Sequence, residues 1–265
     1  MKIHIRLNIK KSPAAGGSNF LKSLKNYFRS IQVYKEKPEN ADAIIFNSHH
    51  QINEIISLKF SYPDIIFVHR IDGPMKSYNN VNDMRDKIVY RANNILADAT
   101  IFQSKWSKES NHRNGLPYSK FETTINNAPD KLIFNKTNRI HSLNKPKIRI
   151  IANSWSTNWN KGFSVYQWLD NNLDYSKYEF VFIGNSPVTF KNIQHIKPLN
   201  SIEMAAELKK SDIFLFASRI EACSNSLLEA LHCGLPVVGA FGSSNHEIIG
   251  KGGELFKMLK RFLFY

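Results

Sequence analysis

The chain of 265 residues has only two cysteines, Cys223 and Cys233, and no Cys-x-x-Cys pair. A zinc centre or a disulfide framework needs clustered cysteine and histidine, and the sequence offers neither. We therefore interpret both cysteines as small buried thiols of a cytosolic protein. Long apolar runs are also missing, because the longest ones, such as Ile213–Ala217, are far below the roughly 20 residues of a membrane-spanning helix. The N-terminal segment MKIHIRLNIKK lacks the apolar core of a signal peptide.

Acidic residues are scarce, since 22 Asp and Glu stand against 36 Lys and Arg and give a formal net charge of +14. Such an excess attracts nucleic acids, anionic membranes or phosphorylated small molecules. No block of five or more like charges occurs, so a dedicated nucleic-acid surface is not favoured and we expect no nucleic-acid partner. We expect a cytoplasmic protein, and peripheral contact with the inner face of an anionic membrane is the alternative to a location free in the cytoplasm.

Short apolar runs alternate along the chain with stretches of helical periodicity. The expected strands are 3–7, 43–46, 65–68, 99–103, 123–126, 148–152, 180–183, 193–196, 213–216 and 236–240, and the expected helices are 19–28, 80–94, 162–172, 202–209 and 226–233. Strands separated by helices are typical of parallel α/β sheets. The polar stretch Phe134–Lys147 has no periodicity and predicts a linker between domains at 1–138 and 146–265.

The segment EACSNSLLEALHCGLP (221–236) carries Glu221 before a small polar loop and Glu229 inside the helix that follows. Ligands of open α/β sheets lie beyond the carboxyl ends of the strands, and a helix N-terminus favours phosphate. The small residues Ser224, Asn225 and Ser226 would let an anion approach the amides. The structural alternative is a capping box between Ser226 and Glu229, which leaves Glu221 without explanation.

The same segment resembles the E-x7-E signature of retaining glycosyltransferases of family 4, which have the GT-B fold. Further segments resemble motifs of that family in the same order, namely PAAGGSNFLKSL (13–24), FQSKWSKE (102–109), INNAPDKLIF (125–134), NKGF (160–163), FIGNSP (182–187) and GGELF (252–256). The resemblance implies an α/β protein of two Rossmann-like domains facing a central cleft. It also implies that the C-terminal domain binds a nucleotide sugar and the N-terminal domain the acceptor.

The implied activity is the transfer of a sugar, with retention, from a UDP- or GDP-sugar to a glycan, lipid-linked or small-molecule acceptor. By this resemblance Glu229 binds the ribose hydroxyls, Glu221 faces the donor sugar, and Lys161 stabilises the departing diphosphate. The further donor-binding residues expected are Gly16, Gly17, Asn153, Ser154, Gly184, Asn185, Ser224, Asn225 and Ser226. No cofactor and no metal are expected, since no DxD-type pair is present. Asp170 and Asp174 are expected to be solvated.

The sequence departs from the family pattern before Lys161. The family usually carries an arginine there, but no Arg or Lys lies between Ile151 and Asn160. Asn153, Ser154 or Asn158 would supply neutral hydrogen bonds, which are about half as strong as charged ones. The alternative is therefore a catalytically degenerate nucleotide-binding GT-B protein. Lesser alternatives are a nucleotide-sugar epimerase and a basic nucleic-acid binder.

In the N-terminal half, the segment VHRIDGP (68–74) places His69, Arg70 and Asp72 at the carboxyl end of an expected strand. We expect His69 or Asp72 to bind or orient the acceptor hydroxyl. The alternative is a structural histidine followed by an Asp-Gly-Pro turn.

At the C-terminus, the resemblance ends near Phe256 and KMLKRFLFY follows, so we expect a truncated final domain of marginal stability. The residues Met258, Leu259, Phe262 and Leu263 are expected to form one apolar face that docks on the sheet or on a membrane.

Overall fold

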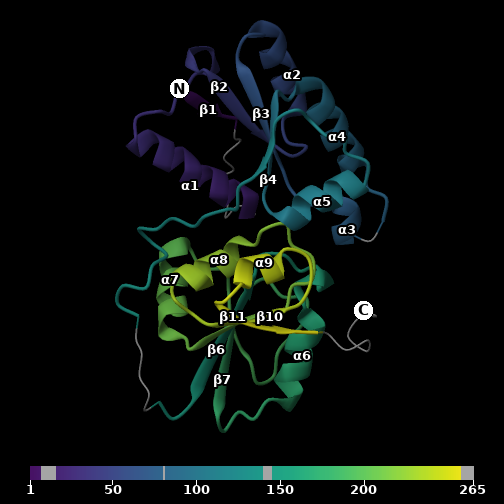
Figure 1. The fold of residues 1–265 in the computed structure, drawn as a ribbon. Helices are drawn as coiled ribbons and strands as arrows, with labels where there is room; N and C mark the ends of the chain where they lie inside the picture. The colour runs from purple at the N-terminus through teal and green to yellow at the C-terminus, as the bar shows by residue number, and fades with distance from the viewer. Residues whose placement is uncertain (7–15, 80, 140–144, 258–265) are drawn as a thin grey trace. The chain divides into compact units, whose positions relative to one another are not determined.

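The computed structural model describes residues 1–6, 16–79, 81–139 and 145–257. The chain forms two units, Met1–Asn127 and Ala128–Tyr265, and each consists of a parallel sheet with helices around it (Figure 1). The predicted α/β class with parallel sheets is confirmed. The division between the units lies closer to the N-terminus than the linker expected at 134–147, because Phe134 is buried in the core of the second unit.

The first unit has a five-stranded sheet in the order β1-β2-β3-β4-β5. Its strands are β1 (Ile3–Ile5), β2 (Ala43–Asn47), β3 (Ile66–Ile71), β4 (Ala99–Phe102) and β5 (Glu122–Thr124). Its helices are α1 (Gly16–Ser30), η1 (Pro38–Asn40), α2 (Ile52–Ser61), α3 (Met75–Asn79), α4 (Met84–Leu96) and α5 (Lys105–Arg113). Every residue of β2 is buried, as expected for a strand with helices on both faces.

The second unit has a six-stranded sheet in the order β11-β10-β9-β6-β7-β8. Its strands are β6 (Ile148–Ser154), β7 (Tyr178–Gly184), β8 (Gln194–Ile196), β9 (Ile213–Phe216), β10 (Val237–Ala240) and β11 (Gly253–Phe256). Its helices are η2 (Trp159–Lys161), α6 (Phe163–Asn172), α7 (Ser201–Lys210), α8 (Asn225–His232) and α9 (Asn245–Ile249). From β6 the chain first builds one half of the sheet through β7 and β8, then returns to β9 and builds the other half.

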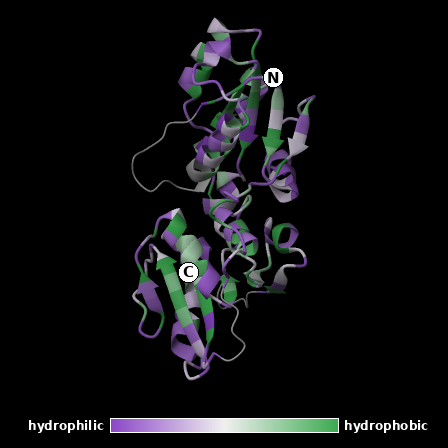
Figure 2. Cartoon of the chain, turned by 90° about the vertical axis from the view of Figure 1, so that its left-hand side faces the viewer, coloured by the Kyte–Doolittle hydropathy of each residue, from purple (hydrophilic) through white to green (hydrophobic). Residues whose placement is uncertain are grey.

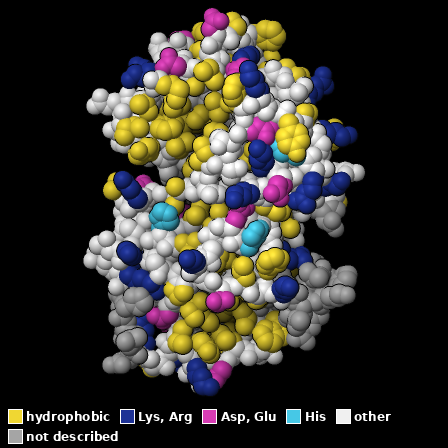
Figure 3. Space-filling model, in the orientation of Figure 1, with side chains coloured by type: hydrophobic (Ala, Val, Ile, Leu, Met, Phe, Trp, Pro, Cys, Tyr) yellow, Lys and Arg dark blue, Asp and Glu magenta, His cyan; other side chains and the backbone are white. Residues whose placement is uncertain are grey.

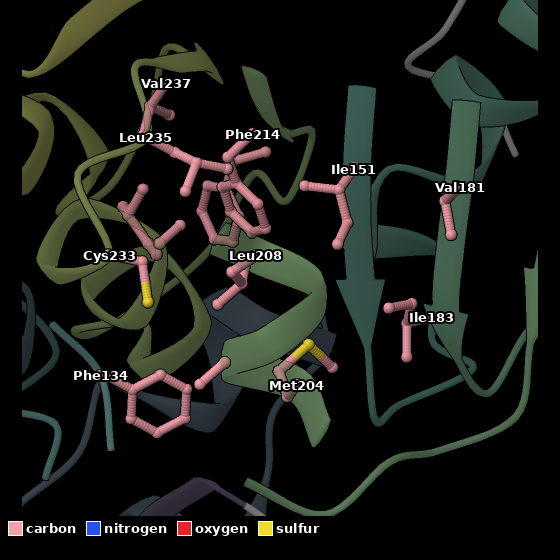
Figure 4. Packing of buried hydrophobic residues seen from close by; sticks show 14 of the residues in the cluster. Phe134, Ile151, Val181, Ile183, Met204, Leu208, Phe214, Cys233, Leu235 and Val237 are labelled. Atoms are coloured by element: carbon pink, nitrogen blue, oxygen red, sulfur yellow. The ribbon is translucent and has the colours of Figure 1, made fainter. Parts of the chain in front are cut away.

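Alternating side chains of the central strands build two separate cores in the second unit. Phe214 of β9 packs with α7, α8 and α9 on one face, and Leu215 packs with α6 on the other. Figure 4 shows Phe134 beside Leu208 and Cys233 in the first of these cores. The central strands β7 and β9 are largely buried on both faces and have almost continuous apolar sequences. Figure 2 shows green stretches in the strands, with purple ones among them.

The expectation that Asp170 is solvated is wrong, because this residue of α6 is only 3% exposed. Its carboxylate accepts hydrogen bonds of 2.8 Å from the backbone N–H groups of Lys191, Asn192 and Ile193. Burial alone would raise the pKa of this carboxyl, but the three N–H donors outweigh it and the pKa lies below its usual value. Asp170 therefore fixes the loop that leads into β8.

Basic side chains are scattered over the visible surface of each unit and form no single block (Figure 3). Within the described ranges, no helix has the length and apolarity needed to cross a membrane. Gly16 and Gly17 are the first residues of α1, so that helix begins earlier than the sequence predicts. The segment 13–15 of the glycine-rich motif and the C-terminal residues Met258, Leu259, Phe262 and Leu263 lie outside the described residues.

Candidate functional site

The candidate site of the second unit lies where β6 and β9 end side by side. These strands pair in parallel at the centre of the sheet, and the connections that leave them run in opposite directions. Such a switch in strand order is the place where open α/β sheets bind ligands, beyond the carboxyl ends of the strands. The loops are residues 155–162 after β6 and 217–224 after β9. Lys161 belongs to the first loop, and Glu221 belongs to the second.

Gly162 brings these two loops into contact. Its φ of +89° lies in the left-handed region, and a Cβ atom at this position would lie 2.4 Å from the Cβ and from the carbonyl oxygen of Ala217. Only glycine permits both the turn and this approach. The neighbouring carbonyl of Asn160 accepts a 3.0 Å hydrogen bond from the N–H of Arg219, which fastens the two loops together.

Lys161 and Glu221 form an ion pair at this junction. The Lys161 Nζ lies 2.6 Å from Glu221 Oε1, and the two side chains are 22% and 13% exposed. The hydroxyl of Ser218 donates to the same carboxylate oxygen at 2.5 Å. The N–H of Glu221 donates to Ser243 Oγ at 2.9 Å, so the loop after β10 also holds this residue in place. A cation and a carboxylate are thus fixed together, although 60 residues separate them in the chain.

The helix α8 begins at Asn225, one residue before the predicted start at Ser226, and its N-cap is Ser224. The Ser224 hydroxyl accepts from the N–H of Leu227, and Glu229 lies inside the helix. The capping box between Ser226 and Glu229 is therefore ruled out as the explanation of Glu229. Gly234 follows the C-cap with a φ of +80°, which confirms the predicted helix end. The N-terminal end of α8, where a helix has N–H groups without intrahelical partners, follows directly after the loop 217–224 that holds Glu221.

Glu229 has no hydrogen bond to its carboxylate from any residue that the structure describes. Burial raises its pKa to about 8, because an apolar environment disfavours the charged form. Protein carboxylates in such surroundings normally have partners, since an unpaired buried charge is costly. The role in binding ribose hydroxyls that the resemblance implies for Glu229 stays a prediction.

The end of β7 is fastened to the end of β6. Gly184 has a φ of +122°, and a Cβ atom there would lie 2.0 Å from the carbonyl oxygen of Ser154. The N–H of Asn185 donates to that carbonyl, and its side chain donates to the carbonyl of Trp155, both at 2.8 Å. The Ser154 hydroxyl donates to the Ser156 carbonyl at 2.7 Å, so it closes a turn.

Two asparagines expected to give neutral hydrogen bonds differ in their surroundings. Asn158 accepts from the N–H of Asn160 at 2.8 Å and caps η2, so its oxygen is occupied. Asn153 is buried, its amide nitrogen lies 3.6 Å from the sulfur of Met204, and its Oδ1 atom has no partner. Among the described residues, no group of three or more His, Cys, Asp or Glu is arranged to hold a metal ion. Metal independence stays a prediction.

In the first unit, His69 is fully buried. Its Nε2 atom lies 2.9 Å from the carbonyl of Ser48, its Nδ1 atom lies 3.2 Å from the amide of Asn93, and its ring stacks on Phe46. Burial lowers the pKa of His69 to about 4, so the ring is neutral. Both nitrogens are engaged within the unit, which leaves no atom for an acceptor. This matches the structural alternative for the histidine.

Asp72 and Arg70 lie beside this histidine. The Arg70 guanidinium is buried, donates to the side chains of Asn47 and Asn127, and lies 3.5 Å from Asp72. The Asp72 side chain is 36% exposed and accepts from Gln103. Of the two residues expected to contact an acceptor, only Asp72 therefore has a side chain that reaches the surface of the unit.

Substituting Gly162 by alanine should lower the free energy of unfolding by about 2–5 kcal/mol, because backbone strain adds to the overlap with Ala217. Gly250→Ala is the matched control in the same unit, since Gly250 also has a positive φ, of +47°, but no atom lies within 4 Å of its added Cβ. It should cost about 1–3 kcal/mol from backbone strain alone, because its ψ of −120° lies outside the left-handed α region. Urea unfolding of both variants measures the difference, and equal losses would contradict the close approach of the two loops.

Comparison with proteins of known structure identifies the class of fold. HepE of Anabaena in complex with UDP-glucose is 13% identical, with a TM-score of 0.72 over 97% of this chain and 85% of that chain. Sucrose-phosphate synthase of Thermosynechococcus elongatus is 13% identical, with a TM-score of 0.67 over 95% of this chain and 69% of that chain. The two parallel-sheet units and these neighbours define the GT-B glycosyltransferase fold, so the predicted fold is confirmed.

At the level of sequence, residues 164–260 match the family model of glycosyl transferases group 1. This segment includes Glu221, Glu229 and the helix α8, but it begins after Lys161. No curated protein matches the chain. A third similar structure, the α,α-trehalose 6-phosphate synthase of Burkholderia multivorans, is 11% identical, with a TM-score of 0.59 over 91% of this chain and 65% of that chain.

The structure adds three residues that the sequence analysis did not assign to the site, namely Ser218, Arg219 and Ser243. Ser218 and Ser243 hold the carboxylate and the backbone of Glu221. No sequence signal distinguishes such serines from others. Arg219 is different, because it is a basic residue three positions after the predicted strand 213–216. The absence of a cation between Ile151 and Asn160 makes its position significant.

Proposed function

We propose that the protein is a retaining glycosyltransferase of family 4 that transfers a sugar from a UDP- or GDP-sugar to a glycan, lipid-linked or small-molecule acceptor without a metal. The observation that carries the proposal is the arrangement of Lys161, Glu221 and the unpaired Glu229 around the start of α8. The group 1 family match over 164–260 and a structural neighbour described in complex with UDP-glucose support a nucleotide-sugar donor.

The diphosphate of the donor would lie at the start of α8. The backbone amides of Asn225 and Ser226 and the positive end of the helix dipole favour an anion there. Lys161, held in the adjoining loop, would stabilise the negative charge that develops as the bond between sugar and diphosphate breaks. The nucleotide side would be lined by Gly184, Asn185, Asn153 and Ser154. Gly16 and Gly17 remain proposed donor-binding residues.

The two glutamates would bind different sugars of the donor. Glu229 would accept hydrogen bonds from the two ribose hydroxyls, which are adjacent and suit the two oxygens of one carboxylate. Glu221 would use its second oxygen for hydroxyls of the transferred sugar, since Lys161 and Ser218 both contact Oε1. The Lys161–Glu221 pair would thereby align the sugar with its leaving group.

Retention would follow from substitution on one face of the sugar. The acceptor oxygen forms a bond to the anomeric carbon on the face from which the diphosphate oxygen departs, and the acceptor proton passes to that diphosphate oxygen. No nucleophilic carboxylate is needed in this scheme. Asp72 would orient the acceptor hydroxyl, with His69 as a buried support for the strand that carries it. A peripheral contact with an anionic membrane would serve a lipid-linked acceptor.

Calorimetric titration with UDP and GDP tests this function directly. We expect one of the two to bind in the micromolar range, and Glu229→Ala to weaken that binding at least tenfold because the ribose loses its acceptor. The protein should then hydrolyse a sugar donor that contains the preferred nucleotide, or transfer the sugar of that donor. A folded protein that binds neither nucleotide would overturn the proposal, and binding without any turnover would replace it with the degenerate nucleotide-binding alternative.

A further inference from the structure

The charge balance of the proposed donor site is incomplete with Lys161 alone. A nucleoside diphosphate that leaves carries two to three negative charges. Lys161 is 2.6 Å from the carboxylate of Glu221, and as an ion pair the two side chains have no net charge. The start of α8 contributes only about half a positive charge. The proposed function therefore requires a further cation near the loop of Lys161, and the inference below rests on that function.

Arg219 is the basic side chain that the fold places beside this loop. The loops after β6, β9 and β10 comprise residues 155–162, 217–224 and 241–244, and all of them are described. Their only basic side chains are Lys161 and Arg219. Arg219 lies two residues before Glu221 and is half-buried. No carboxylate within the described residues pairs with it, whereas Lys161 does have such a partner.

The position of Arg219 is fixed by three hydrogen bonds to its surroundings. Its N–H donates to the carbonyl of Asn160 at 3.0 Å, and its carbonyl accepts from Ser243 Oγ at 3.0 Å. Its guanidinium donates from Nη2 to Asn160 Oδ1, also at 3.0 Å. The last contact aims the side chain at the turn that carries Lys161, since Asn160 is the residue directly before it.

We propose that Arg219 is the second cation of the donor site and binds the diphosphate together with Lys161. A guanidinium has five N–H donors, and the contact with Asn160 uses one of them. The others suit the paired oxygens of a phosphate, which arginine binds in a bidentate manner. Asn160 acts as a positioning residue that holds the guanidinium in place. The cation missing between Ile151 and Asn160 is thus supplied by the loop after β9.

The inference predicts that Arg219 distinguishes nucleoside diphosphates from monophosphates. We expect Arg219→Gln to weaken binding of the preferred diphosphate, UDP or GDP, by about 10- to 100-fold, the usual effect of losing a charged hydrogen bond. Binding of the matching monophosphate, UMP or GMP, should change less than threefold. Arg219→Lys should lie between wild type and Arg219→Gln, because it keeps the charge and loses the bidentate geometry. Calorimetric titration of each variant with both nucleotides measures this.

The control is Lys251→Gln, which removes one positive charge from an exposed residue of the same unit that follows α9 and precedes β11. It should leave both affinities within twofold of wild type. If Arg219 only fastened the two loops, its variants would weaken diphosphate and monophosphate by the same factor, and that result would overturn the inference. The thermal transition of each variant verifies that it is folded. If Arg219→Gln does not fold, Arg219→Lys still tests the inference, because lysine keeps a hydrogen-bond donor for Asn160.

The two hypotheses fail in different ways. Wild-type protein that binds neither UDP nor GDP would overturn the proposed function, and the role of Arg219 would fall with it. Wild-type protein that prefers the diphosphate, with the same preference retained in Arg219→Gln, would overturn the role of Arg219 alone and leave the proposed function intact.

Discussion

Binding of the preferred nucleotide should strengthen as the pH rises from 6 to 8, by up to about tenfold per pH unit, and then level off. The cause is Glu229, whose pKa burial raises to about 8 in the free protein. Ribose hydroxyls donate to the ionised carboxylate and thereby lower its pKa in the complex. Binding at pH 6 or 7 must therefore release a proton, and the release becomes unnecessary once the pH exceeds 8.

Calorimetry in two buffers with different ionisation enthalpies measures this proton release. Glu229→Gln is the matched control, because glutamine accepts a hydrogen bond at the same place and does not titrate. The phosphate groups of the ligand titrate identically in both proteins, so the difference between them isolates Glu229. An equal pH dependence in wild type and variant would show that Glu229 does not contact the nucleotide or is already ionised.

The same carboxyl also makes stability depend on pH, which gives an independent check of its state. Glu229 has its usual pKa of 4.5 in the unfolded chain and a pKa of about 8 in the folded chain. Between pH 4.5 and pH 8 it is therefore protonated in the folded protein and ionised in the unfolded chain. The folded protein then binds more protons, so the free energy of unfolding decreases as the pH rises from about 4.5 to 8. Glu229→Gln should remove that decrease and be the more stable protein at pH 9.

Much of the site follows from sequence because its residues come directly after apolar strands. The pattern IFLFASRIE places Glu221 just after β9, and the glycine after Lys161 marks a turn after β6. Parallel strands of one sheet end at one edge, which predicts that the two side chains approach each other. The ion pair between them also needs the order of β6 and β9 in the sheet, and no local pattern contains that order.

What the sequence did not predict depends on partners that are distant in the chain. His69 lies in the strand β3 and has its partners in the loop after β2 and in α4, so its burial is a property of the assembled unit. Asp170 is bound by backbone groups more than 20 residues later. The strand β11 was not among the expected strands, because it begins at Gly253, directly after another glycine, and glycine weakens a strand pattern.

Replacing Lys161 should have the largest effect on the reaction, and we expect Lys161→Met to lower the turnover number by about 100- to 1000-fold, as for other groups that stabilise a developing charge. Methionine keeps the length of the side chain but cannot donate a hydrogen bond. The affinity for the donor should fall much less, because the start of α8 and Glu229 still bind the nucleotide. Steady-state rates with the sugar donor, set beside the calorimetric affinity, separate the two effects.

The ion pair makes this prediction sharper, since Lys161→Met also leaves the carboxylate of Glu221 half-buried without its cation. A double-mutant cycle with Glu221→Gln corrects for that loss. If Lys161 serves only as a structural partner of Glu221, Glu221→Gln should restore the turnover that Lys161→Met removes. If Lys161 stabilises the leaving diphosphate, the double variant should be as slow as Lys161→Met or slower, because neutralising Glu221 does not return a positive charge to the site.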